Sequence, residues 1–140
     1  MEGKWPKDMQ VAQVRIGRPT DQLKTVEEFY CKGVGLQKLT SFEGAGYEGI
    51  LIGLPHTTYH LEFTQHKDGS PCPAPTNDNL LVLYIPDKKT INEIANRLQA
   101  MGYDSVPPEN PYWEEAGVTI EDPDGWRLVL MNTAGIGNGN

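Results

Sequence analysis

The segment Glu121-Asp122-Pro123-Asp124-Gly125-Trp126-Arg127-Leu128-Val129-Leu130 joins two extended runs through a sharp turn. Residues 117–121 and 126–131 are rich in apolar and β-branched residues, which favour strands. Asp122-Pro123-Asp124-Gly125 is a strong β-turn sequence, because proline fixes its own φ and glycine tolerates a positive φ. The segment therefore predicts a hairpin that ends the ordered part of the chain.

The second half of the chain leads up to this hairpin through a strand, a helix and a short strand. Residues 79–85 form a nearly continuous apolar run, as in a buried strand. After Pro86-Asp87, apolar residues recur at helical spacing and Gly102 ends the helix: Ile91, Ile94, Ala95, Leu98 and Met101. Residues 103–106 then form a short strand. The second half thus reads as strand, helix and three strands.

The first half repeats this order. Residues 11–17 alternate, with Val14 and Ile16 on one face and Gln13 and Arg15 on the other. Residues 21–32 have helical spacing, with Gly33 as the expected stop. Strands are predicted at residues 36–42, 47–54 and 58–66, separated by turn sequences.

The repeated element order predicts an α+β protein with two βαβββ modules and a site between them. A length of 140 residues suits one domain, which we place at residues 9–134. Module one spans residues 9–66, a proline-rich connector residues 67–78 and module two residues 79–134. The glycine- and asparagine-rich tail, residues 135–140, is predicted to be disordered.

Composition excludes several functional classes. Acidic residues outnumber basic ones by 19 to 12, the formal charge is −7, and no basic stripe is present, so nucleic acid is not an expected partner. No signal peptide and no membrane-spanning stretch are recognisable, so we expect a cytoplasmic protein without a membrane partner. Cys31 and Cys72 are expected to be reduced thiols.

Three local phrases, in this order and spacing, resemble the vicinal oxygen chelate superfamily of glyoxalases, bleomycin-resistance proteins and extradiol dioxygenases. They are Glu27-Glu28-Phe29-Tyr30 followed by Gly33-Val34-Gly35-Leu36, then His60-Leu61-Glu62-Phe63-Thr64, and then the hairpin segment quoted above. The resemblance covers residues 11–132. It implies two βαβββ modules that curl into a half-open mixed β-barrel with helices outside, and commonly a homodimer.

The resemblance also implies where metal ligands would lie, namely on the first and last strands of each module. Glu62 occupies a carboxylate-ligand position and is the candidate metal ligand. Leu80 and Val129 occupy two further positions, and neither side chain offers a lone pair. The first-strand position falls on Gln13 or Arg15, and only Gln13 can ligate a metal. No cofactor is therefore expected, and a divalent metal would need a differently assembled site.

Glu62 needs a partner if it lies inside a barrel, because a buried unpaired carboxylate is costly. Arg15 and Arg127 can supply the positive charge that the missing ion would have carried. The alternative is that both arginines point to solvent at strand ends. His60 shares a strand face with Glu62 and Thr64, so His60 and Glu62 are candidate catalytic residues, although a structural histidine is the simpler interpretation.

Leu80, Val82 and Val129 are expected to form an apolar wall of the cleft, with Trp113 at its aromatic rim. The full set of candidate ligand-binding residues is Gln13, Arg15, Glu62, Thr64, Leu80, Val82, Trp113, Arg127 and Val129. This set favours a protein that binds a small organic molecule, aromatic or cationic, without a catalytic metal. The alternatives are a metal-dependent lyase, isomerase or dioxygenase, and a cofactor-free enzyme that uses His60 and Glu62 as acid and base.

Overall fold

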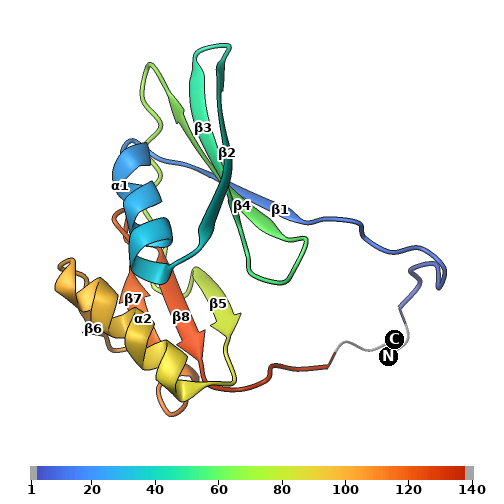
Figure 1. The fold of residues 1–140 in the computed structure, drawn as a ribbon, viewed down its shortest axis with the longest axis vertical. Helices are drawn as coiled ribbons and strands as arrows, with labels where there is room; N and C mark the ends of the chain where they lie inside the picture. The colour runs from blue at the N-terminus through green and yellow to red at the C-terminus, as the bar shows by residue number, and fades with distance from the viewer. Residues whose placement is uncertain (1–2, 138–140) are drawn as a thin grey trace.

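The computed structural model describes residues 3–137 and contains two four-stranded sheets (Figure 1). The first sheet has the order β1 (Arg15–Pro19), β4 (His60–His66), β3 (Tyr47–Gly53), β2 (Gln37–Gly44). The second repeats it with β5 (Leu80–Tyr84), β8 (Arg127–Met131), β7 (Gly117–Glu121), β6 (Ser105–Val106). In each sheet the first strand is parallel to the last and the other pairs are antiparallel. The prediction of two βαβββ modules is confirmed.

Each module carries a helix on the same side of the molecule (Figure 1). In module one, α1 (Leu23–Glu27) continues into a π-helical segment, η1 (Glu28–Val34). In module two, α2 (Lys88–Ala100) begins at Asp87, whose side chain accepts hydrogen bonds from the backbone N–H of Lys89 and from the Thr90 hydroxyl. A short 3-10 turn, η2 (Pro111–Trp113), precedes β7. No helix among the described residues has the length and apolarity that crossing a bilayer requires.

Gly33 does not stop the first helix, contrary to the prediction. The π-helical segment runs through it to Val34, and Gly35, at φ 95°, is the left-handed cap. A Cβ at position 33 would lie 2.3 Å from Cδ2 of Leu98 in α2. Gly33 therefore serves the close approach of the two helices, which residue type alone did not distinguish from a helix stop.

The first strand also differs from its prediction. It spans Arg15–Pro19 instead of residues 11–17, because β4, its pairing partner, begins at His60 opposite Arg15. Ile16 lies opposite the buried Leu61 of β4, on the face of the sheet that points to the core. It is nevertheless more than half exposed, because β1 is an edge strand. Of the tail predicted to be disordered, residues 135–137 form no helix or strand, and residues 138–140 lie outside the described residues.

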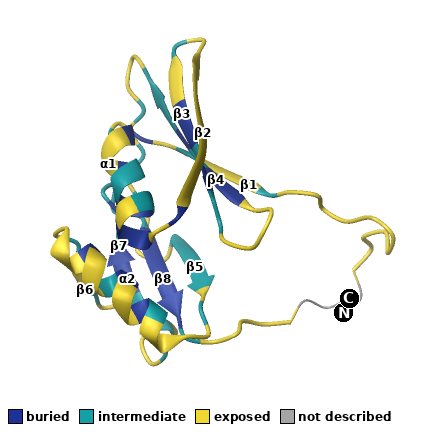
Figure 2. Cartoon of the chain, viewed as in Figure 1, coloured by how far each residue is buried: buried dark blue, intermediate teal, exposed yellow. Residues whose placement is uncertain are grey.

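One apolar core lies between the helices and both sheets (Figure 2). Phe29 and Leu98 from the two helices meet β-strand residues Ile52, Leu128 and Leu130, and all five side chains are buried to at least 98% of their surface. Burial of such a side chain contributes roughly 1.5–3 kcal/mol. The two modules therefore share one core on the helix side of both sheets.

A buried polar contact joins the modules across this core. Asp122, in the turn before β8, accepts hydrogen bonds at 2.7 Å from both the Arg18 guanidinium of β1 and the Tyr30 hydroxyl of η1. Its other oxygen accepts the backbone N–H groups of Asp124 and Trp126. The Arg18 guanidinium also lies 5.0 Å from the ring centroids of Phe63 and Trp126. Asp122 thus shapes its own turn and fixes module one against it.

Burial, and then the negative charge of Asp122, raise the pKa of Tyr30 well above its ordinary value. The phenol therefore stays protonated and continues to donate to Asp122 over the physiological range.

We expect Asp122→Asn to lower the free energy of unfolding by about 3 kcal/mol, because it removes the buried carboxylate 2.7 Å from the Arg18 guanidinium and leaves only Asp124, at 3.5 Å. Urea unfolding followed by circular dichroism measures the change. Asp104→Asn, at an exposed position after α2, is the matched control and should stay within about 0.5 kcal/mol of wild type. Equal stability of the two variants would contradict the central role given to Asp122.

We expect Tyr30→Phe to destabilise the protein at neutral pH by about 1–2 kcal/mol through loss of the hydrogen bond to Asp122. Because the pKa of Tyr30 is higher in the folded protein than in the unfolded chain, the protonated phenol stabilises the fold. This contribution is complete below the unfolded-state pKa of about 10 and is lost as the pH rises through the folded-state pKa. The gap between wild type and Tyr30→Phe should therefore narrow above about pH 10. Urea unfolding at a series of alkaline pH values tests this expectation. Tyr112→Phe, at an exposed position, is the control, and its difference from wild type in unfolding free energy should not change with pH.

Candidate ligand-binding site

The face of the first sheet that points away from the helices carries the polar residues of β4. Leu61 and Phe63 point into the core, so His60, Glu62 and Thr64 lie on the opposite side of the strand. We call this side the open face of the first sheet. His60 is buried on it, whereas Glu62 and Thr64 are partly exposed.

Arg15 lies beside these residues because β1 and β4 pair in parallel register, with Arg15 opposite His60 and Gly17 opposite Glu62. The Arg15 Nε donates to Nε2 of His60 at 2.8 Å. One of its terminal nitrogens, Nη1, lies 3.4 Å from a carboxylate oxygen of Glu62. The predicted Arg15–Glu62 ion pair is therefore present, and Arg15 also binds His60.

Gly17 leaves room for the Glu62 carboxylate. A Cβ at this position would lie 3.0 Å from Oε1 of Glu62, which is tighter than ordinary packing allows. The absence of a side chain at residue 17 thus lets the carboxylate lie against β1 within reach of Arg15.

The contact with Arg15 uses one ring nitrogen of His60, Nε2, as the hydrogen-bond acceptor. Nδ1 is buried and has no hydrogen-bond partner among the described residues. In this arrangement Arg15 bonds to both candidate catalytic residues and lies between them, instead of His60 and Glu62 forming a direct pair.

The donor set on the open face does not fit a divalent metal ion. Such a site generally needs three protein ligands, and a guanidinium has no lone pair to offer and carries a repelling charge. Arg15 occupies the position next to both His60 and Glu62 where an ion would lie. Among residues 3–137, no cluster of three or more histidine, cysteine, aspartate or glutamate side chains is arranged to hold a metal.

The corresponding face of the second sheet is covered by the chain itself. Val129 and its cross-strand neighbour Thr119 are almost completely buried on it. Pro107, in the loop before η2, accepts a hydrogen bond from Arg127 through its carbonyl, and the carbonyl of Trp113 lies 2.3 Å from where a Cβ of Gly117 would be. We call residues 107–116 the covering loop, because it lies across this face.

Arg127 does not pair with Glu62, which corrects one of the two predicted partnerships. Its guanidinium lies 3.2 Å from Glu121, the residue opposite it in β7, and is held by the covering loop. The reason is register, since a residue at the start of β8 faces the end of β7 directly. Trp126 is likewise structural, because its indole N–H donates to the carbonyl of Cys72 in the connector.

The predicted site residues therefore form two groups. Arg15, His60 and Glu62 are in contact, with Thr64 further along the same face. The second group lies on or over the second sheet: Leu80, Val82, Trp113, Arg127 and Val129. No hydrogen bond or ion pair joins the groups within the described chain. Gln13 precedes β1 and is exposed, so Arg15 is the first-strand residue on the open face.

Arg18 is the important residue that the sequence interpretation missed, because the predicted strand ended at residue 17. Extending the alternation by one residue places Arg18 on the same side as Ile16, toward the core. A buried arginine requires a carboxylate partner, and this requirement is the signal that points to Asp122.

Comparison with known sequences finds two family models in succession. The YycE-like N-terminal domain matches residues 14–64 and the YycE-like C-terminal domain matches residues 78–132. The uncharacterized protein YycE of Bacillus subtilis is 50% identical over 135 residues, which cover 96% of this chain and 97% of that protein.

Comparison with solved structures gives the same result. A YycE protein from Bacillus subtilis superimposes with a TM-score of 0.88 at 49% identity, over 95% of this chain and 98% of the other. The fosfomycin resistance protein FosX from Mesorhizobium loti shares the fold, with a TM-score of 0.69 at 13% identity over 90% and 94% of the two chains. An antibiotic-binding protein from a Streptomyces species also shares the fold. Its TM-score is 0.63 at 21% sequence identity, over 88% of this chain and 97% of the other. With its paired modules and these relatives, the chain belongs to the YycE-like family of the vicinal oxygen chelate superfamily.

Proposed function

We propose that this protein binds a small organic molecule at the open face of the first sheet, without a resident catalytic metal. The observation that carries the proposal is the Arg15 guanidinium between His60 and Glu62. It supplies a fixed positive charge at the place where metal-dependent relatives would hold an ion. A cytoplasmic location fits this function and is part of the proposal.

The chemistry of the face indicates what it can recognise. The Arg15 side chain is half exposed, and its contacts with His60 and Glu62 leave N–H donors free for a ligand. Glu62 and Thr64 add an acceptor and a hydroxyl, and Leu51 of β3 lies opposite Glu62. A partly apolar molecule with polar groups at one end suits this arrangement.

The names of the structural relatives agree with such a role. They include an antibiotic-binding protein and glyoxalase/bleomycin-resistance proteins, as well as FosX. Below 25% identity these likenesses show a common fold, and the binding function is our inference for this chain.

We further propose that the protein works as a homodimer. Within residues 3–137, no second layer covers the open face, because the helices of both modules pack into one core on the other side. A second copy can supply that layer.

We expect protein purified without chelator to contain substoichiometric zinc, manganese, nickel and iron, and Arg15→His to gain a divalent site. The substitution removes the guanidinium and adds an imidazole next to His60 and Glu62, which completes a three-ligand set. Elemental analysis and zinc titration by calorimetry measure the difference. We expect at least tenfold tighter zinc binding than in wild type.

Arg15→Met is the matched control, because it removes the charge without adding a ligand and should not bind zinc tightly. Stoichiometric metal in the wild type that is lost in Glu62→Ala would overturn the proposal. That result would favour a metal-dependent lyase, isomerase or dioxygenase instead.

We expect ligand binding to depend on Arg15. A thermal-shift screen with bleomycin, fosfomycin and a panel of planar aromatic and cationic compounds identifies a stabilising probe, and calorimetry measures its affinity. Loss of a charge-assisted hydrogen bond costs about 1.5–3 kcal/mol, so Arg15→Met should weaken binding roughly 10–100-fold. Lys24→Met, on α1, should leave the affinity unchanged. Chemical conversion of the probe, abolished by His60→Ala, would instead support an acid–base enzyme.

A further inference from the structure

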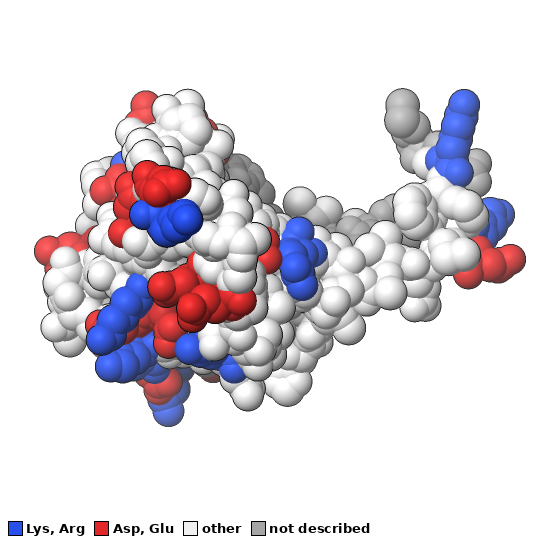
Figure 3. All heavy atoms as spheres, turned by 90° about the horizontal axis from the view of Figure 1, so that it is seen from above, with Lys and Arg blue, Asp and Glu red and all other residues white. Residues whose placement is uncertain are grey.

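Residues 3–14 form an arm that leaves the body of the protein at the start of β1 (Figure 1). Three apolar side chains on it, Trp5, Met9 and Val11, are each more than half exposed. The arm carries Lys4, Lys7 and Asp8, and Figure 3 shows both basic and acidic side chains at its far end, at a distance from the mixed acidic and basic patches of the body. Exposed apolar residues at the end of a projecting segment commonly mark a contact with a partner.

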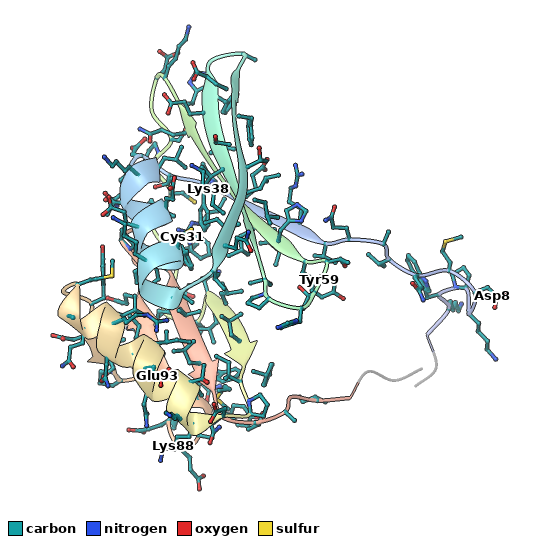
Figure 4. All side chains as sticks on the ribbon, viewed as in Figure 1. Asp8, Cys31, Lys38, Tyr59, Lys88 and Glu93 are labelled. Atoms are coloured by element: carbon teal, nitrogen blue, oxygen red, sulfur yellow. The ribbon has the colours of Figure 1, made fainter. Side chains whose placement is uncertain are left out.

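The end of the arm has a structure of its own. The backbone N–H of Met9 donates to the carbonyl of Pro6 at 3.2 Å, and the Trp5 indole N–H donates to the carbonyl of Met9 at 2.5 Å. These bonds close a turn, at which Asp8 is labelled in Figure 4. The turn presents the Trp5 ring between two lysines in sequence, so the arm offers an aromatic and basic binding element.

A surface of opposite character lies at the tip of the β2–β3 hairpin. Glu43 and Glu48 are directly opposite each other in the antiparallel register, where like charges destabilise a sheet. Neither forms an ion pair with any residue that the structure describes. Both line a hollow of about 420 Å³ together with Tyr47, Gln65, His66 and Lys67. An adjoining hollow of about 480 Å³ shares the two glutamates and is also lined by Phe42, Lys24 and Lys38.

The arm points away from the hairpin tip of its own chain. In the β3–β4 pairing, the tip residue Tyr47 lies opposite His66, at one end of β4. The arm enters β1 at Arg15, opposite His60 at the other end of β4. The two complementary elements therefore lie at opposite ends of the same sheet, an arrangement that favours contact between two chains.

We propose that residues 3–14 bind the β2–β3 hairpin tip of a second copy of this chain. Lys4 and Lys7 neutralise the Glu43–Glu48 pair, and the Trp5 ring packs against Tyr47 in the hollow of about 420 Å³ that both glutamates line. Exchange of both arms makes the contact twice around a twofold axis. This contact is measured as self-association of the protein, so it can be tested without a ligand.

A charge exchange between two variants tests the contact. Variant one carries Lys4→Glu and Lys7→Glu, and variant two carries Glu43→Lys and Glu48→Lys. Sedimentation velocity should show each variant dimerising at least tenfold more weakly than wild type. An equimolar mixture should recover wild-type association, because both arm–hairpin contacts of the mixed dimer then join opposite charges.

Circular dichroism of each variant alone verifies folding, and Trp5→Ser provides a second variant that changes no charge. It should also weaken dimerisation at least tenfold. A mixture that associates no better than the separate variants would overturn the proposal, as would a wild-type protein that stays monomeric. Unchanged dimerisation of Trp5→Ser would have the same consequence, since a dimer held by other surfaces does not need the arm.

Discussion

The contact between Arg18 and Asp122 is the constraint on which the arrangement of the two modules depends. Asp122 is buried, and its two oxygens accept four hydrogen bonds, two from its own turn and two from module one. Because the same carboxylate shapes the β7–β8 turn and binds Arg18, the hairpin of module two cannot form in its observed shape without presenting an acceptor to module one. The Asp-Pro-Asp-Gly sequence is thus both a local turn and a joint between modules.

This constraint also determines the orientation of the candidate site. Arg15 and Arg18 are three residues apart in β1, so their side chains point to opposite faces of the sheet. With Arg18 held toward Asp122 and the aromatic rings of Phe63 and Trp126, Arg15 must point to the open face, next to His60 and Glu62. The structural charge of Arg18 on one side of the strand therefore places the Arg15 guanidinium on the other.

Element order and the partnership of Glu62 with Arg15 could be predicted, because both follow from local periodicity and from the cost of an unpaired carboxylate. The sequence was less informative where long-range packing decides. Gly33 has the residue type of a helix stop, but its use depends on Leu98, 65 positions away in the chain. Arg127 is placed by the register of β7 and the covering loop. The burial of Val129 follows from the same loop, whose path no pattern of alternation describes.

A guanidinium in place of a metal changes what this fold can recognise. A divalent ion accepts lone pairs directly and can polarise a bound oxygen, whereas Arg15 offers N–H donors in one plane and cannot be displaced from its strand. Part of its donor capacity is already used by His60 and Glu62, which hold the group in a fixed orientation. Under the function proposed above, this site would select hydrogen-bond acceptors that match the orientation of the guanidinium. The Glu62 carboxylate then helps to hold the Arg15 guanidinium in place.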